Sequence, residues 1–160
     1  MKDLFGKAIL DFQTNNSPED LITETNISEA DEMRVDYLFR SFNEMPKLEK
    51  KALQLCKGKV LDVGCGPGRH AYALAERGIA VHGVDIAQTF IDLARDRAPQ
   101  GATFERLDAR ALPFDAEFDA VISLCQGAFG LAGGAAAVGP DPDGVVLDGM
   151  ARALRPGGRI

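Results

Sequence analysis

Hydrophobic positions recur at two different spacings along the chain, and the change falls near residue 59. Before it, apolar residues lie three and four apart, which is typical of amphipathic helices. The spacing predicts helices over 4–12, 28–45 and 48–56. The middle one rests on the capping-box spacing of Ser28 and Asp31 and on an apolar stripe formed by Val35, Leu38, Phe39 and Phe42. We therefore expect residues 1–58 to form a helical N-terminal cap.

From residue 59 onward, short apolar strands alternate with helices. The predicted strands cover 60–63, 79–84, 102–107 and 118–125, and the predicted helices cover 69–76, 90–94 and 145–154. Strands that alternate with helices form a parallel sheet that is covered on both faces. The pattern predicts an α/β domain over residues 59–160, with a doubly wound, mostly parallel sheet and helices on both faces.

Composition narrows the classes of function. A chain of 160 residues, 46% hydrophobic and 26% charged, is typical of one soluble globular domain. A net charge of −6 disfavours a surface for nucleic acid or for an anionic membrane, because either needs basic side chains. The three cysteines form no metal-ligand pattern, so we expect reduced thiols and no metal. No apolar run has the length of a signal peptide or of a membrane span, and we expect a cytoplasmic protein.

The chemistry-bearing motif is a glycine-rich loop, Asp62-Val-Gly-Cys-Gly-Pro-Gly68, between a predicted strand and a predicted helix. Glycines there let a ligand approach the backbone beside the free N–H groups of the helix. Arg69 occupies the place of the third glycine of the dinucleotide fingerprint, which disfavours NAD. Asp85 lies 21 residues after Gly64, where an acid accepts hydrogen bonds from a ribose. An adenosine ligand without phosphates fits both observations.

Over residues 59–160 the chain resembles the class I S-adenosylmethionine-dependent methyltransferases, which share a Rossmann-like fold. Five further stretches resemble family motifs and occur in the family's order, at 83–86, 108–109, 112–114, 118–121 and 154–158. The resemblance implies S-adenosylmethionine as cofactor and S-adenosylhomocysteine as product. The cofactor-binding residues that it implies are Asp62, Gly64, Cys65, Gly66, Asp85, Ile86, Asp108, Ala109, Leu124 and Cys125.

The resemblance also implies a role for most of these residues. Gly64 and Gly66 would lie under the methionine part of the cofactor, and Asp62 near its ammonium group. Asp85 would bind both ribose hydroxyls. Ile86 would cover one face of the adenine, Asp108 and Ala109 would hold it, and Asp108 would accept from its amino group. Leu124 and Cys125 would lie beside the position of methyl transfer.

Two interpretations stay open at the level of single residues. Asp62 could instead cap backbone N–H groups of the loop. His70 opens a helix and could act as an acid or base, although such a histidine is more often without a catalytic role. Methyl transfer from a sulfonium depends mainly on the positioning of the acceptor, so no catalytic residue is assigned.

The predicted function is transfer of the sulfonium methyl group to an unidentified acceptor, with a small molecule as the default. One alternative is a cofactor-binding module or fragment without turnover. Another is an NAD-dependent oxidoreductase, which the loop spacing disfavours. The glycine-rich stretch 127–134 is either a mobile loop over the active site or a flexible connector.

The sequence departs from the family in two places. Ala87 stands where a serine or threonine usually caps the second helix, at a cost of about 1 kcal/mol. Residues 157–160 lie where the fifth of seven strands would begin, so we expect a truncated sheet without its last three strands. Strand 118–125 would then be an apolar edge strand, which predicts self-association through that strand.

Overall fold

The computed structural model describes residues 4–24, 29–124 and 141–160. The chain forms two compact units, Met1–Arg40 and Ser41–Ile160, each with its own internal contacts. No helix in the described part of the chain combines the length and the apolar character that crossing a membrane requires.

The first unit is only partly helical. Its elements are α1 (Leu4–Thr14), β1 (Leu21–Thr23), β2 (Asp31–Met33) and the 3-10 helix η1 (Val35–Phe39). The helix predicted from residue 28 is wrong, because β2 pairs with β1 in an antiparallel hairpin. Asp20 Oδ1 then accepts a hydrogen bond from Val35 N at 3.0 Å, which fixes the chain as it leaves the hairpin. These contacts between distant residues override the local apolar spacing.

The second unit begins before the predicted domain boundary. It includes the 3-10 helix η2 (Phe42–Glu44) and helix α2 (Lys47–Leu55). The capping box occurs at η2, where Ser41 N donates to Glu44 Oε2 at 2.9 Å. Helix α2 therefore belongs to the same compact unit as the sheet.

The sheet of the second unit has five parallel strands in the order β5-β4-β3-β6-β7. The strands are β3 (Val60–Val63), β4 (Val81–Asp85), β5 (Ala102–Arg106), β6 (Phe118–Ile122) and β7 (Leu154–Arg159). The remaining helices are α3 (Arg69–Ala75), α4 (Gln88–Asp96), η3 (Ala109–Ala111) and α5 (Pro142–Ala153). This arrangement confirms the predicted doubly wound α/β fold.

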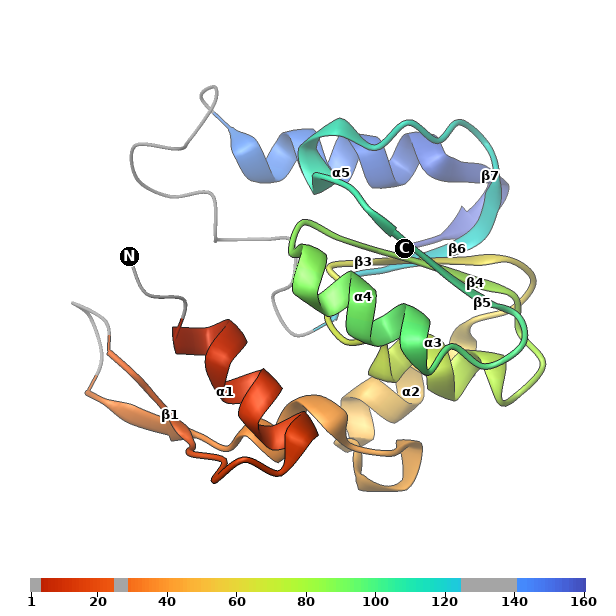
Figure 1. Cartoon of the computed structure of the whole chain (residues 1–160). Helices are drawn as coiled ribbons and strands as arrows, with labels where there is room; N and C mark the ends of the chain where they lie inside the picture. The colour runs from red at the N-terminus through yellow and green to blue at the C-terminus, as the bar shows by residue number, and fades with distance from the viewer. Residues whose placement is uncertain (1–3, 25–28, 125–140) are drawn as a thin grey trace. The chain divides into compact units, whose positions relative to one another are not determined.

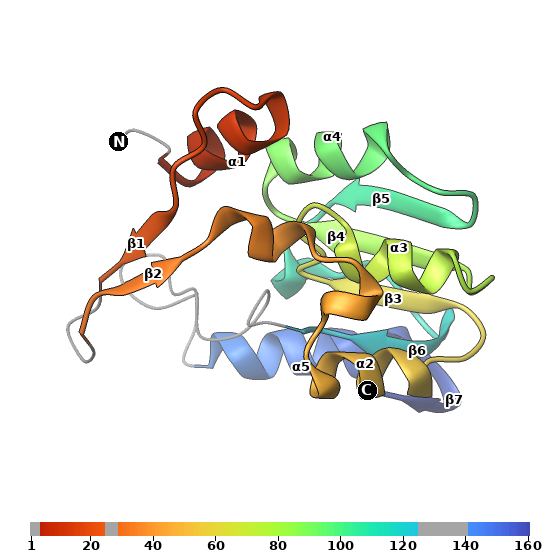
Figure 2. The same ribbon diagram turned by 90° about the horizontal axis from the view of Figure 1, so that it is seen from below.

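Helices cover both faces of this sheet. Helices α2, α3 and α4 pack on one face around a core that includes Leu53, Leu74 and Ile91. Helix α5 packs on the other face, where Met150 contributes to a second core cluster (Figures 1 and 2). Strand β3 lies in the middle of the sheet, so its carboxyl end is surrounded by protein on both sides.

The prediction of an exposed fourth strand is wrong. Strand β7 pairs with β6, with Phe118 opposite Leu154 and Ala120 opposite Arg159. Strand β7 contains Pro156, Gly157 and Gly158, and the pairing of β6 with β7 has a shift in register between Phe118 and Ala120. Among the described strands β6 is therefore an inner strand, with β3 on one side and β7 on the other. The predicted self-association depended on an unpaired β6, and β6 is paired on both sides.

Candidate cofactor site

The glycine-rich loop leaves the carboxyl end of β3 and is tied to the neighbouring strand. Gly64 N and Cys65 N both donate to Val84 O of β4, at 2.8 and 3.0 Å. Gly64, Gly66 and Gly68 have φ values of 73°, 54° and 92°, which side chains rarely adopt. A Cβ at Gly66 would meet nothing within 4 Å. The backbone at Gly66 therefore faces open space that a ligand can enter.

The third glycine of the loop serves packing rather than open access. A Cβ at Gly68 would lie 2.9 Å from the ring of Tyr72. On β4, a Cβ at Gly83 would lie 2.7 Å from the ring of Phe104 and 3.0 Å from Cys65 Sγ. Both glycines let aromatic side chains pack beneath the loop. This packing role is not evident from the sequence, where its only signal is the spacing of the glycines.

Cys65 points its side chain into this packing. The residue is 4% exposed and belongs to the core on the α3 side of the sheet. Burial raises the pKa of its thiol far above the ordinary value. Cys65 can therefore contribute to a ligand site only through its backbone.

Asp85 connects three parts of the site. Its Oδ2 accepts from Gly66 N at 2.9 Å, and its Oδ1 accepts from Ala87 N at 2.9 Å. The residue thus links the end of β4 to the loop and to the start of α4. Ala87 is the N-cap of α4 and provides no side-chain cap, as predicted. A carboxylate has about four acceptor positions, so Asp85 can still accept from a ligand. The adjacent Ile86 is 58% exposed.

Asp108 follows β5 and caps η3. Its carboxylate accepts from Arg110 N at 2.9 Å and forms an ion pair with Arg110 Nη2 at 2.6 Å. The hydrogen bond from the guanidinium holds the pKa of this carboxyl below its usual value. Ala109, the next residue, is partly buried against the core on the α5 side. A ligand at this position must share Asp108 with Arg110.

Asp62 is the least satisfied polar group of the site. It lies on β3, is 1% exposed, and its Oδ2 has no hydrogen-bond partner. Burial raises its pKa to about 7, while the charge of Arg69 opposes this shift and the charge of Asp85 adds to it. Asp62 Oδ2 accepts no hydrogen bond from the backbone N–H groups of the loop. This oxygen therefore gives no support to the interpretation that Asp62 caps the loop. A buried carboxylate without a partner is costly, and a cationic group of a ligand would relieve that cost.

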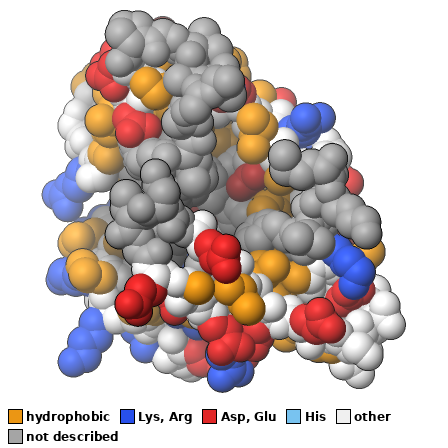
Figure 3. Space-filling view, turned by 90° about the vertical axis from the view of Figure 1, so that its left-hand side faces the viewer, with side chains coloured by type: hydrophobic (Ala, Val, Ile, Leu, Met, Phe, Trp, Pro, Cys, Tyr) orange, Lys and Arg blue, Asp and Glu red, His pale blue; other side chains and the backbone are white. Residues whose placement is uncertain are grey.

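The fold brings these acids to one edge of the sheet. Asp62, Asp85 and Asp108 lie at or just after the carboxyl ends of β3, β4 and β5, which are parallel neighbours. Figure 3 turns the left-hand side of Figure 1 toward the viewer, and acidic and apolar side chains are exposed on it. In doubly wound sheets, ligands bind in the crevice outside the carboxyl ends of the strands.

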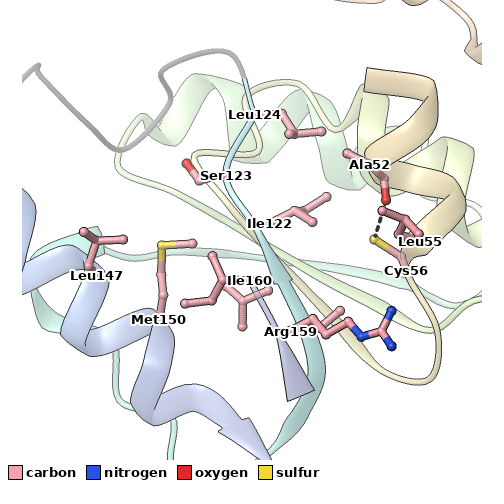
Figure 4. A pocket seen from close by; sticks show the side chains of 12 residues that line it. Ala52, Leu55, Cys56, Ile122, Ser123, Leu124, Leu147, Met150, Arg159 and Ile160 are labelled. Carbon is pink, nitrogen blue, oxygen red and sulfur yellow. Dashed lines mark hydrogen bonds between the residues drawn. The ribbon is translucent and has the colours of Figure 1, made fainter. Parts of the chain in front are cut away.

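Leu124 lies two residues after Ile122, which pairs with Asp62 of β3, and it packs against the core cluster that includes Cys65. It lines a cavity of about 350 Å³ beside β6, α2 and α5, which includes Ser123, Met150 and Ile160 but none of the three acids (Figure 4). Cys125 and the stretch 127–134 lie outside the described residues.

His70 is buried, at 4% exposure, and its Nε2 lies 3.0 Å from Glu49 Oε2 on α2. Its side chain therefore belongs to the interior of the unit. Glu49 was not among the residues singled out in the sequence, because a glutamate within the polar run of α2 carries no signal of burial.

Comparisons with known proteins agree with this geometry. Residues 60–158 match the family described as "Methyltransferase domain". Methyltransferase GfsG of Streptomyces halstedii is 33% identical over 138 residues, which cover 81% of this chain and 46% of that protein. A ubiquinone biosynthesis O-methyltransferase of Idiomarina loihiensis is 36% identical over 109 residues, which cover 64% of this chain and 40% of that protein.

A solved structure extends the similarity to nearly the whole chain. It is that of an S-adenosylmethionine-dependent methyltransferase from Bacteroides fragilis in complex with S-adenosylhomocysteine. The two chains are 33% identical with a TM-score of 0.78, and the match covers 98% of this chain and 62% of that one. The chain spans about half the length of the curated relatives it matches.

The fold and the site thus define a class of protein, the Rossmann-like methyltransferases. The chain belongs to the S-adenosylmethionine-dependent methyltransferase family. S-adenosylmethionine is the cofactor that this membership indicates, and the residues fit it. The loop backbone is open at Gly66, and the buried Oδ2 of Asp62, which has no hydrogen-bond partner, suits an ammonium group.

Proposed function

We propose that the chain is the cofactor-binding part of an enzyme that transfers the methyl group of S-adenosylmethionine to a small-molecule acceptor. The observation that carries this proposal is the unpartnered Oδ2 of Asp62, buried beside a glycine loop whose open face is at Gly66. A cofactor with a primary ammonium group beside an adenosine supplies the missing partner.

Each acid has a distinct role in this proposal. Asp62 pairs with the ammonium of the methionine part, and the backbone of Gly64, Cys65 and Gly66 lies against that part. Asp85 accepts hydrogen bonds from the ribose hydroxyls while it continues to hold Gly66 N. Asp85 thus couples binding of the ribose to the shape of the loop.

The adenine end is built by less buried residues. Ile86, at the end of β4, covers one face of the ring with an exposed apolar side chain. Asp108 accepts from the adenine amino group and remains ionised through its pair with Arg110. Ala109 lies beside it at the start of η3. Leu124 and Cys125 stay assigned to the end nearest the methyl group on the resemblance alone.

The chemistry follows from the cofactor, which supplies a methyl group on a sulfonium with a good leaving group. The residues of the chain bind the two ends of the molecule and hold it in place. The transfer then depends on an acceptor atom held in line with the methyl group at roughly 3 to 3.5 Å. The contribution of this chain is orientation of the cofactor.

A small acceptor is favoured over nucleic acid by charge. The chain carries a net charge of −6, and acidic residues gather at the carboxyl edge of the sheet. The Idiomarina relative is named as an O-methyltransferase of ubiquinone biosynthesis, which supports a small-molecule acceptor. Cys56 and Cys65 are free thiols, which supports a location in the cytoplasm.

The test is calorimetric titration of S-adenosylhomocysteine into the 160-residue chain, with NADH as the competing cofactor class. We expect micromolar binding of S-adenosylhomocysteine and none of NADH. Circular dichroism establishes that the chain is folded. A folded chain that shows no heat with S-adenosylhomocysteine would contradict the proposal.

A further inference from the structure

A buried cluster of charged side chains joins α2 to the first turn of α3, directly after the glycine loop. Glu49 Oε2 lies 3.0 Å from His70 Nε2 and 3.5 Å from Arg69 Nη2. Arg69 Nε lies 3.2 Å from the same histidine nitrogen. The three side chains are each less than one tenth exposed. The desolvation of buried charges often costs as much free energy as their attraction gains, so such a cluster contributes little to stability. Its presence therefore suggests a role other than stability.

Arg69 also acts on the carboxylate of the cofactor site. Its positive charge lowers the pKa of Asp62 against the effect of burial. Yet Asp62 Oδ2 has no hydrogen-bond partner, while Glu49 Oε2 is within ion-pair distance of the guanidinium. Arg69 thus has two buried carboxylates in its surroundings and makes an ion pair with Glu49.

We propose that Glu49 is a positioning residue for the cofactor, because its ion pair with Arg69 keeps the guanidinium from pairing with Asp62. Asp62 is thereby left available to the ammonium group. The inference rests on the proposed function, since it takes Asp62 as the partner of that group. It assigns a role to a residue of α2, which lies outside the family match at residues 60–158.

Other groups around Asp62 do not provide this control. Asp85 of β4 is an acid and raises the pKa of Asp62. Cys65 of the loop and Cys56, which follows α2, are buried thiols whose own pKa values are raised in part by the charge of Asp62. Among the described groups with a resolved effect on Asp62, Arg69 supplies the opposing positive charge. Glu49, whose Oε2 lies 3.5 Å from Arg69 Nη2, therefore competes with Asp62 for this positive charge.

The test compares four forms of the full chain by titration with S-adenosylhomocysteine at pH 8. They are the unchanged chain, Glu49→Gln, Glu49→Gln combined with Arg69→Gln, and Glu117→Gln as a control for loss of a surface ion pair with Lys59. We expect Glu49→Gln to weaken binding roughly tenfold, because a charged hydrogen bond from Arg69 to Asp62 must be given up on binding. The double variant recovers most of the affinity, and Glu117→Gln binds like the unchanged chain.

The pH profile adds a readout that a purely structural role would not move. We expect the midpoint of the rise in affinity with pH to shift downward in Glu49→Gln and upward in Arg69→Gln alone. A folded Glu49→Gln that binds like the unchanged chain, or a double variant no better than Glu49→Gln, would overturn the inference. If Glu49→Gln does not fold, an unmoved midpoint in Arg69→Gln overturns it. Failure of the proposed function looks different, because then the unchanged chain does not bind or Asp62→Asn binds equally well.

Discussion

The two ends of strand β3 use the same residue types for opposite purposes. At the amino end, Gly58 has a φ of 69°, and a Cβ there would collide with the carboxylate of Asp119. Asp119 accepts from Lys59 N at 2.7 Å and pairs with Arg155 Nη1 at 3.0 Å. At the carboxyl end, Gly66 also has a positive φ, but its open side faces no atom within 4 Å.

The acids differ in the same way as the glycines. The hydrogen bond from Lys59 N lowers the pKa of Asp119, and the carboxylate is satisfied within the chain. Burial raises the pKa of Asp62, whose Oδ2 has no partner. At the amino end, the glycine and the acid contact each other, and the acid has hydrogen-bond partners within the chain. At the carboxyl end, the glycine faces open space and an oxygen of the acid has no partner, which is what a ligand site requires. The following substitutions test this contrast.

The largest effect is expected from Asp85→Ala at the carboxyl end. The change removes the acceptor of the ribose hydroxyls and frees Gly66 N and Ala87 N. Loss of two charge-assisted hydrogen bonds predicts at least a hundredfold weaker binding of S-adenosylhomocysteine, roughly 3 kcal/mol, by titration calorimetry. Asp92→Ala is the matched control, because Asp92 on α4 is bonded to the exposed Gln88. Equal affinity in Asp85→Ala and the unchanged chain would remove Asp85 from the site.

Much of the carboxyl end could be predicted from the sequence, because its signals are local. Short apolar runs predict the strands of the sheet, and the site residues lie at the carboxyl ends of these runs. They are the loop glycines, Asp62 and Asp85. The unpartnered state of Asp62 could not be predicted in this way. It depends on Arg69 being held by Glu49, and Glu49 lies 20 residues earlier in sequence than Arg69.

At the amino end the expected effect is on stability. The left-handed conformation of Gly58 costs an alanine about 1–2 kcal/mol, and the collision with Asp119 adds to it. We expect urea denaturation of Gly58→Ala to show a loss of about 2 kcal/mol in the free energy of unfolding, with unchanged affinity for S-adenosylhomocysteine. Gly78→Ala separates the two causes, since Gly78 has a φ of 77° and nothing within 4 Å of a Cβ. A loss no greater than in Gly78→Ala would show that the collision is absorbed without cost.

Gly66→Ala should reverse that outcome. Its φ of 54° makes the backbone strain similar to that of Gly78→Ala, and the new methyl group occupies the side that a ligand approaches. Overpacking by one methyl group costs about 2 kcal/mol, which predicts roughly thirtyfold weaker binding of S-adenosylhomocysteine. The loss of stability should match that of Gly78→Ala. If Gly66→Ala lost stability as Gly58→Ala does and kept its affinity, the contrast between the two ends would be wrong.

The errors of sequence analysis came from pairings between distant residues. Residues 28–45 have helical spacing, yet the β1–β2 hairpin and the bond from Val35 N to Asp20 determine their structure. Residues 154–159 contain a proline and two glycines, and they form a strand because β6 offers an unpaired neighbour. In both places a weak local preference was outweighed by hydrogen bonds that no local pattern encodes.

The smallest effect is a dependence of binding on pH, which reports the charge of Asp62. Burial raises the pKa of this carboxyl from its ordinary value of 3.8 to about 7 in the folded chain. If the ammonium of the ligand pairs with the ionised form, the dissociation constant of S-adenosylhomocysteine should rise about tenfold between pH 8 and pH 6. Titrations in buffers with different enthalpies of ionisation should show proton release on binding near pH 6.5. Asp62→Asn should bind weakly and without this dependence.

Stability should change with pH in the opposite sense to binding. Below about pH 3.8 both states carry a protonated Asp62, so burial of the acid costs little. Between about pH 3.8 and pH 7 the unliganded folded state keeps a proton that the unfolded chain has lost, so stability falls as the pH rises, and above pH 7 the loss is complete because both states are ionised. Asp62→Asn should therefore melt at a higher temperature than the unchanged chain at pH 8, and the difference should shrink as the pH falls toward 4. An Asp62→Asn variant less stable at pH 8 would mean that Asp62, like Asp119, is satisfied within the chain.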